Sequence, residues 1–238
     1  MNRLNLLFTK DGLQYQIVKG HTVLEDNLYL VDENFTTAQL EAKLDEALAS
    51  RDLSSINVLS AINHFTMMPE GFQDHEEGYH LIGYNAPTKS ESEELMLSVN
   101  RRYRLQFYYS FPKSYYQKIK ALNLPTRFNF SGEKFLTTIQ PKFEKEIHIN
   151  LYHNQCEFIA LENKKVMLYN NLDVDSEVDF LYFIMFTLNK INFSITETRF
   201  FVYGETTENE TFVSELNKFV KHLKINFDNT AKNNFILS

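Results

Sequence analysis

The chain has 238 residues, of which 43% are hydrophobic and 23% are charged, an ordinary composition for a globular protein with a substantial core. A formal net charge of −7 argues against a general polyanion binder, while it leaves room for a local basic patch. The single cysteine, Cys156, excludes an internal disulfide, and no apolar run of about 18 residues is available to span a membrane.

The amino-terminal sequence lacks the features of a signal peptide. Its apolar run is short, and no small-residue cleavage site follows it. These features predict a soluble protein, with a reducing cytoplasm as the simplest compartment.

The first part of the chain is expected to fold as three strands, a helix and a fourth strand. Asp11-Gly12 between two apolar runs indicates a tight hairpin. Thr36 followed by Gln39 fits an N-terminal capping box, in which each side chain satisfies a backbone N–H of the other residue. The helix follows Thr36, and the strands are expected at residues 4–8, 13–18, 23–31 and 56–60.

The middle of the chain has a less regular pattern. Pro69-Glu70 suits a helix start, because proline is tolerated in a first helical turn, and residues 73–78 are expected to form a polar loop. A helix is expected at residues 114–122, and strands at 79–84, 95–99, 104–110, 128–130 and 135–139. The best boundary is Gln140-Pro141, which separates an amino-terminal lobe with an irregular insertion (1–140) from a carboxy-terminal lobe (141–238).

Beyond Pro141 the pattern becomes regular. Three antiparallel strands are expected at residues 147–151, 156–161 and 165–169. Ser176 and Asp179 fit a second capping box, and the helix that they open is apolar almost all round, which predicts burial on more than one side. An inner strand at 198–203 ends at Gly204, and Thr207 with Glu210 caps a last helix.

The second half therefore has the order strand, strand, strand, helix, strand, helix, and the first half repeats it loosely. This order is the lobe plan of the actin-like ATPase fold. The expected fold class is α/β or α+β: two ribonuclease H-like lobes, each built on a mixed sheet.

A set of short motifs resembles a bacterial protein family. Asp11-Gly12-Leu13 with Tyr15 looks like the first hairpin of that family, and residues 65–72 look like its aromatic-Pro-Glu segment. Its core signature is matched by residues 168–171, 179–182, Leu188 and 201–205. The family is domain of unknown function 3822. The resemblance implies a two-lobed actin-like ATPase fold with no assigned activity and no catalytic residues to carry over.

In actin-like ATPases the first hairpin of each lobe holds phosphates, so ATP with magnesium would bind in the interlobe cleft. The cleft candidates are Asp11, Gly12 and Gly204. The second hairpin offers residues 153–155 (HNQ), without glycine or acid, and Glu205 would repel phosphates. Because the chain has only seven glycines, a close backbone cradle is difficult to build. ATP hydrolysis is therefore not expected, and no cofactor is assigned.

Two charged clusters of the first half suggest binding sites, but each also has a simpler structural explanation. Residues 74–77 (DHEE) with His80 contain metal-ligand types, but their spacing differs from the H-E-x-x-H motif, so we favour a solvated acidic loop and no metal site. Arg101, Arg102 and Arg104 beside aromatic residues suit single-stranded nucleic acid. In an acidic chain, an exposed turn that leads into a buried strand is the better interpretation.

The second half contains cysteine and histidine, two residue types that are common in catalytic sites. Cys156 lies near His153, but no third partner is visible, so a buried structural thiol is favoured over a nucleophile. His148 lies on the polar face of its strand and is expected at the surface.

Three functions remain open from the sequence. The first is a non-catalytic actin-like scaffold that binds a protein partner. The second is a nucleotide-binding switch or weak ATPase that uses the cleft near Asp11, Gly12 and Gly204. The third is an accessory protein for RNA or DNA that uses Arg101, Arg102 and Arg104. The scarcity of glycine favours the first over the second, and the negative net charge disfavours nucleic acid.

Overall fold

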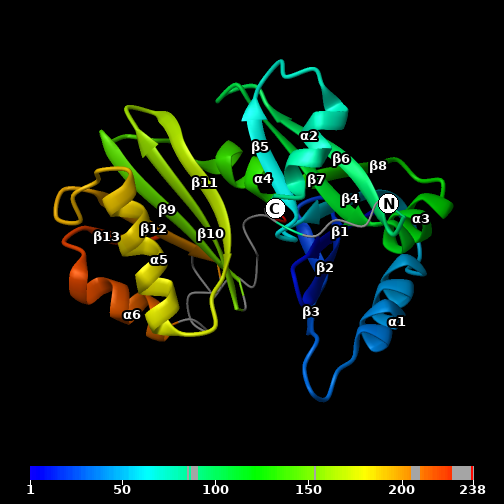
Figure 1. Ribbon diagram of the computed structural model, residues 1–238. Coiled ribbons are helices and arrows are strands. Elements are labelled where there is room, and N and C mark those ends of the chain that lie inside the picture. The colour runs from blue at the N-terminus through cyan, green and yellow to red at the C-terminus, as the bar shows by residue number, and fades with distance from the viewer. Residues whose placement is uncertain (85, 87–90, 153, 205–209, 227–236, 238) are drawn as a thin grey trace. The chain divides into compact units, whose positions relative to one another are not determined.

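The computed structural model describes residues 1–84, 86, 91–152, 154–204, 210–226 and 237 (Figure 1). The described residues form two compact units, one from Met1 to Thr137 with Leu237, and the other from Thr138 to Asn226. The boundary expected at Gln140-Pro141, between lobes of residues 1–140 and 141–238, stays a prediction.

The first unit is built on a five-stranded mixed sheet of order β3-β2-β1-β4-β8. Strands β1, β2 and β3 are antiparallel, whereas β4 runs parallel to both β1 and β8. The elements are β1 (Asn2–Phe8), β2 (Gly12–Lys19), β3 (Thr22–Leu30), α1 (Thr37–Leu48), β4 (Leu53–Ser60) and β8 (Thr126–Phe130).

The predicted capping box at the start of α1 is confirmed. The Thr36 hydroxyl accepts from the backbone N–H of Gln39, and the Gln39 side chain accepts from the backbone N–H of Thr36 at 2.7 Å. The helix then buries Leu40, Leu44 and Leu48 in the core of this unit. A periodic stripe and a cap thus place this helix from the sequence alone.

An insertion between β4 and β8 forms a three-stranded antiparallel sheet of order β5-β7-β6. Its elements are β5 (Phe65–Pro69), α2 (His75–Ile82), β6 (Glu93–Asn100), β7 (Leu105–Pro112) and α3 (Lys113–Ala121), and α4 (Ser131–Thr138) follows β8. The predicted strands at 95–99, 104–110 and 128–130 and the helix at 114–122 are confirmed to within a few residues.

Four predictions in the insertion and after it are wrong. Pro69 ends β5 instead of starting a helix, because an edge strand tolerates a residue without an N–H. The strand expected at 79–84 and much of the loop at 73–78 belong to α2, where Asp74 accepts from the N–H of Glu77 at 3.0 Å. The strand expected at 135–139 is mostly α4, which buries Phe135 and Leu136.

The second unit repeats the plan of the first. Its elements are β9 (Lys145–Tyr152), β10 (Gln155–Glu162), β11 (Lys165–Asp173), α5 (Glu177–Lys190), β12 (Arg199–Gly204), α6 (Glu210–Phe219) and β13 (Leu223–Ile225). The sheet order is β11-β10-β9-β12-β13, and β12 is an inner strand as predicted. Each unit thus places its third, second, first, fourth and fifth sheet strand in the same spatial order, which confirms the predicted actin-like repeat.

Helix α5 begins at the predicted cap but is buried on one side only. Ser176 accepts from the backbone N–H of Asp179 at 3.2 Å, and its hydroxyl donates to the Asp179 carboxylate at 2.7 Å. Phe180 is buried in the core, whereas Val178 and Tyr182 are 75% and 60% exposed. The prediction of burial on several sides is wrong, because α5 and α6 form an outer layer on one face of the sheet (Figure 1). No helix among the described residues is long and apolar enough to cross a bilayer.

Candidate functional site

The face of the second sheet away from α5 and α6 carries a buried row of polar side chains. Along β9, Ile147, Ile149 and Leu151 enter the helix-covered core, so the alternate residues Glu146 and His148 lie on the opposite face. Glu146 is 1% exposed and His148 is 3% exposed. The expectation that His148 lies at the surface is therefore wrong.

The register of β12 against β9 explains why His148 is buried. Phe201 is the Cα partner of His148, and the two rings stack with centroids 4.8 Å apart and planes 13° apart. Tyr203, two residues along the same strand, also stacks on His148, with ring centroids 5.9 Å apart and planes 28° apart. Aromatic side chains of β12, which runs parallel to β9, thus cover His148, although the alternating sequence of β9 alone indicates an exposed polar face.

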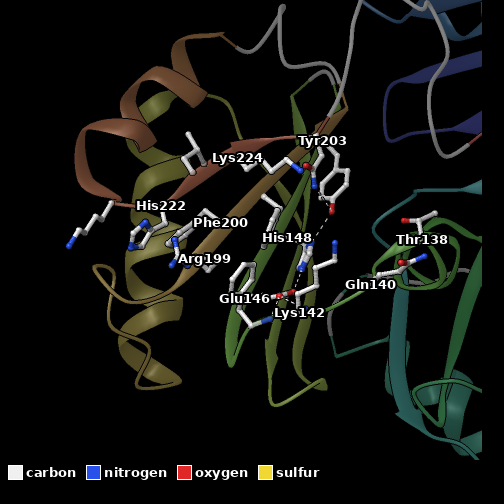
Figure 2. Close-up of a pocket in the computed structure, with 15 residues that line it drawn as sticks. Thr138, Gln140, Lys142, Glu146, His148, Arg199, Phe200, Tyr203, His222 and Lys224 are labelled. Atoms are coloured by element: carbon white, nitrogen blue, oxygen red, sulfur yellow. Dashed lines mark hydrogen bonds and ion pairs between the residues drawn. The ribbon is translucent and has the colours of Figure 1, made fainter.

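A chain of hydrogen bonds runs through this histidine. His148 Nε2 lies 2.9 Å from a Glu146 carboxylate oxygen, and His148 Nδ1 lies 3.0 Å from the Tyr203 hydroxyl (Figure 2). The Asn226 side-chain amide donates to the same hydroxyl at 3.0 Å. The other Glu146 oxygen accepts from the backbone N–H groups of Lys142 and Phe143, both at 2.6 Å.

These contacts set the charge states of Glu146 and His148. Burial opposes ionisation of Glu146, but hydrogen bonds from His148 and from two backbone N–H groups prevail and lower its pKa. Burial lowers the pKa of His148 more than the neighbouring carboxylate raises it. At neutral pH the imidazole is therefore uncharged; it donates from Nε2 to Glu146 and accepts at Nδ1 from Tyr203, whose pKa is raised by burial.

The pH dependence of stability follows from these directions. The pKa of His148 in the folded state is below its ordinary value of 6.5. Below pH 6.5 the unfolded state therefore binds more protons than the folded state does, and stability is lost as pH falls further. Glu146 adds a further loss below 4.5. We expect urea unfolding between about pH 7 and pH 5 to show this loss in the wild type and a smaller loss in His148→Gln. The exposed-histidine variant His21→Gln is the control, and an unchanged slope in His148→Gln would refute the assignment.

A hollow of about 650 Å³ opens over this buried row. Its cationic side chains are Lys142, Arg199, Lys221 and Lys224, and Glu146 is the single carboxylate among its lining residues (Figure 2). The remaining lining residues are Thr138, Gln140, Phe143, His148, Phe200, Phe201, Tyr203, His222, Leu223 and Asn226. We call this hollow the basic groove.

The cations of the basic groove are not neutralised by neighbours. Within the described part of the chain, no carboxylate lies within ion-pair distance of Lys142, Arg199, Lys221 or Lys224. Arg199 lies over the Phe143 ring at 5.1 Å instead, and Phe143 stacks on Phe201 at 6.3 Å. The groove therefore offers a positively charged rim over a floor in which the carboxylate of Glu146 is held by hydrogen bonds, and this arrangement suits an anionic ligand.

The predicted cleft residues lie elsewhere. Asp11 is exposed in the turn between β1 and β2, where its carbonyl accepts from the N–H of Val31 at 2.7 Å. Gly12 begins β2 of the first unit, and Gly204 ends β12 of the second. Glu205, His153 and the Thr207 cap lie outside the described residues.

Both glycines are packed against their own sheets. A Cβ on Gly12 would meet the Leu30 and Thr9 side chains at 2.8 Å. Gly204 has a φ of +82°, and a Cβ there would meet the Leu151 carbonyl oxygen at 2.1 Å. Close strand packing is thus a sufficient reason for glycine at both positions.

The other charged candidates are also placed. The acidic segment is mostly helical and not a loop, because α2 begins at His75. The Nδ1 atom of His75 lies 2.9 Å from the Tyr108 hydroxyl. The described residues contain no group of three or more His, Cys, Asp or Glu side chains placed to hold a metal ion. The arginine cluster lies around the turn between β6 and β7, with Arg104 at a φ of +55°.

The prediction of a buried structural thiol at Cys156 agrees with its environment. Its side chain is 1% exposed in the core of the second unit, among apolar neighbours. Burial raises the pKa of the thiol to about 12, so it stays protonated and is a poor nucleophile.

Comparisons with known proteins agree with the fold. The sequence model described as protein of unknown function (DUF3822) matches residues 1–223. A Bacteroides thetaiotaomicron protein with an actin-like ATPase fold and unknown function is 19% identical, with 98% of this chain and 92% of that chain covered and a TM-score of 0.80. A chain of the PilM-PilN type IV pilus biogenesis complex is 10% identical, with 97% and 92% covered and a TM-score of 0.57. At these identities the likeness concerns the fold alone. No curated protein matches the sequence.

Proposed function

Because this chain belongs to the DUF3822 family of proteins of unknown function, we propose a function from its own side chains: it is a non-catalytic actin-like module that binds a protein partner. The basic groove of the second unit is its binding surface. The observation that carries this proposal is the set of four cations without carboxylate partners in the described chain, gathered at one hollow of a protein with a net charge of −7. Like charges held close together repel one another and lower the stability of the fold, and an anionic ligand that binds there relieves this repulsion.

The alternative is a nucleotide-binding switch that uses Asp11, Gly12 and Gly204. The packing of both glycines weighs against it, because backbone that already lies against a neighbouring strand is not open to a phosphate. Glu146 and Arg199, which both line the basic groove, are Cα partners at the opposite end of the β9–β12 pair from Gly204. The cations of the groove are therefore not extra phosphate ligands at Gly204.

A thermal-shift titration separates the two functions. Mg-ATP, Mg-ADP and Mg-GTP at millimolar concentration are expected to leave the melting temperature unchanged. A ligand at a hundred times its dissociation constant would stabilise the folded state by about 2.7 kcal/mol, which is easily detected. A concentration-dependent rise in melting temperature, lost in Asp11→Ala, would establish the nucleotide switch and overturn our proposal.

A further inference from the structure

The basic groove continues onto a strand edge that is able to pair with another chain. Strand β13 is the last strand of the sheet, and no described strand pairs with its outer edge. His222 O accepts from Phe200 N, and Asn226 N donates to Val202 O, both at 2.8 Å. Because backbone direction alternates along a strand, Leu223 and Ile225 direct their N–H and C=O groups to the outer side.

The cations of the groove lie along this edge. Lys221 lies two residues before β13, and Lys224 lies within β13 as the Cα partner of Phe201, so Lys224 shares the groove face with His148. Both lysine side chains are exposed, and Ile225, which follows Lys224, is 49% exposed. Open backbone groups and two lysines are thus presented together.

We infer that the basic groove binds an extended acidic segment of a partner protein, which adds as a strand beside β13 and places its carboxylates against Lys221, Lys224 and Arg199. Backbone pairing supplies a docking geometry that any extended peptide can use, and the lysines select for acidic side chains. This inference rests on the proposed function, and it adds the chemistry of the partner to it.

Acidic peptide fits the groove better than nucleic acid does. Binding of single strands relies on open aromatic faces on which bases stack. Here the rings already stack on neighbours: His148 on Phe201 at 4.8 Å, and Phe143 under the Arg199 guanidinium at 5.1 Å. The outer edge of β13, which pairs with no strand of the described residues, is also a feature that a polypeptide can use and a nucleic acid cannot.

The one carboxylate in the groove does not oppose this ligand. Glu146 is 1% exposed, and its oxygens accept from His148 and from the backbone N–H groups of Lys142 and Phe143. Its charge is therefore screened inside the floor, while the lysine ammonium groups reach solvent. An incoming carboxylate meets the cations first.

The test is fluorescence anisotropy of the full chain with a fluorescein-labelled glutamate decamer. Binding is expected for the wild type and is expected to weaken about tenfold or more in Lys221→Glu with Lys224→Glu. The matched control, Lys120→Glu with Lys165→Glu, makes the same change of net charge at two exposed lysines outside the groove, and should change affinity by less than about twofold. Equal losses in both double variants would overturn the site, and no binding by the wild type would overturn the inference.

Strand addition has its own variant. Ile225→Pro removes an N–H on the outer edge, where β13 makes no bond to β12, so the fold should be retained while affinity falls about tenfold. Ile225→Val keeps the N–H and should bind as the wild type does. Full affinity in a folded Ile225→Pro variant would refute strand addition. A (dT)₁₀ oligonucleotide that binds more tightly than the glutamate decamer would refute the choice of peptide. Neither result would change the nucleotide titration, so failure of this inference is distinct from failure of the proposed function.

Discussion

Replacing Gly204 by alanine is expected to destabilise the protein by about 4 kcal/mol, the sum of backbone strain and a steric overlap. Gly204 has a φ of +82°, which L-residues rarely adopt, and an added Cβ would lie 2.1 Å from the Leu151 carbonyl oxygen and 2.6 Å from the Asn150 side-chain oxygen. Neither neighbour can move freely, because Leu151 belongs to the ladder between β9 and β12. The measurement is the free energy of unfolding in urea.

The control for this prediction is Gly71→Ala. Gly71 has a similar φ of +92°, but an added Cβ would have nothing within 4 Å. This variant therefore reports the backbone strain alone, about 1 to 2 kcal/mol. If both variants lost the same stability, close packing against Leu151 would not be the reason for glycine at position 204.

The second large effect concerns Glu157, a fully buried carboxylate on β10. It accepts hydrogen bonds from Asn150 Nδ2 at 2.9 Å, Tyr152 OH at 2.8 Å and Tyr169 OH at 2.8 Å. Replacing Glu157 by leucine deprives three donors, two on β9 and one on β11, of this acceptor. At about 1 to 3 kcal/mol for each buried donor that finds no replacement, we expect a loss of about 4 kcal/mol.

The conservative variant Glu157→Gln separates hydrogen bonding from packing. Its amide oxygen still accepts from two of the three donors, so a loss of about 1 kcal/mol is expected. Chemical denaturation of both variants is the measurement. A leucine variant as stable as the glutamine variant would mean that the polar face of this sheet does not depend on its hydrogen-bond network.

The elements that could be predicted from the sequence are those whose signal is local. The caps at Thr36 and Ser176 each lie three residues before a partner that they contact, and the periodic strands of the second unit follow short turns. Because these signals are repeated in both halves, the order of elements in each lobe could be predicted from the sequence pattern together with the family resemblance.

The missed elements depend on tertiary contacts. Helix α2 is stable where it is because Gly78 lets it lie on Tyr108: an added Cβ would be 2.7 Å from that ring. Helix α4 is tied to β6 by Asn100, whose side-chain amide donates to the Glu133 carboxylate at 3.0 Å. Neither contact has a signature in local spacing, and short apolar runs are ambiguous between helix and strand.

The basic groove could not be predicted for a related reason. Its floor needs the parallel register of β12 against β9, which brings Phe201 over His148 from 53 positions along the chain. Alternation along β9 alone indicated an exposed polar face. Lys221 and Lys224 lie more than 20 positions after Arg199 in the sequence, and only the sheet order, which places β13 beside β12, brings the three cations to one groove.

Amide hydrogen exchange of the full chain, measured with the glutamate decamer and separately with Mg-ATP, tests the central claim most directly. Our account predicts that the decamer slows exchange at residues 221–226, above all at Leu223 and Ile225, and that Mg-ATP leaves residues 9–13 unchanged. Protection of residues 9–13 by Mg-ATP, with no protection of β13 by the decamer, would contradict the claim that this protein binds an acidic partner through its second unit.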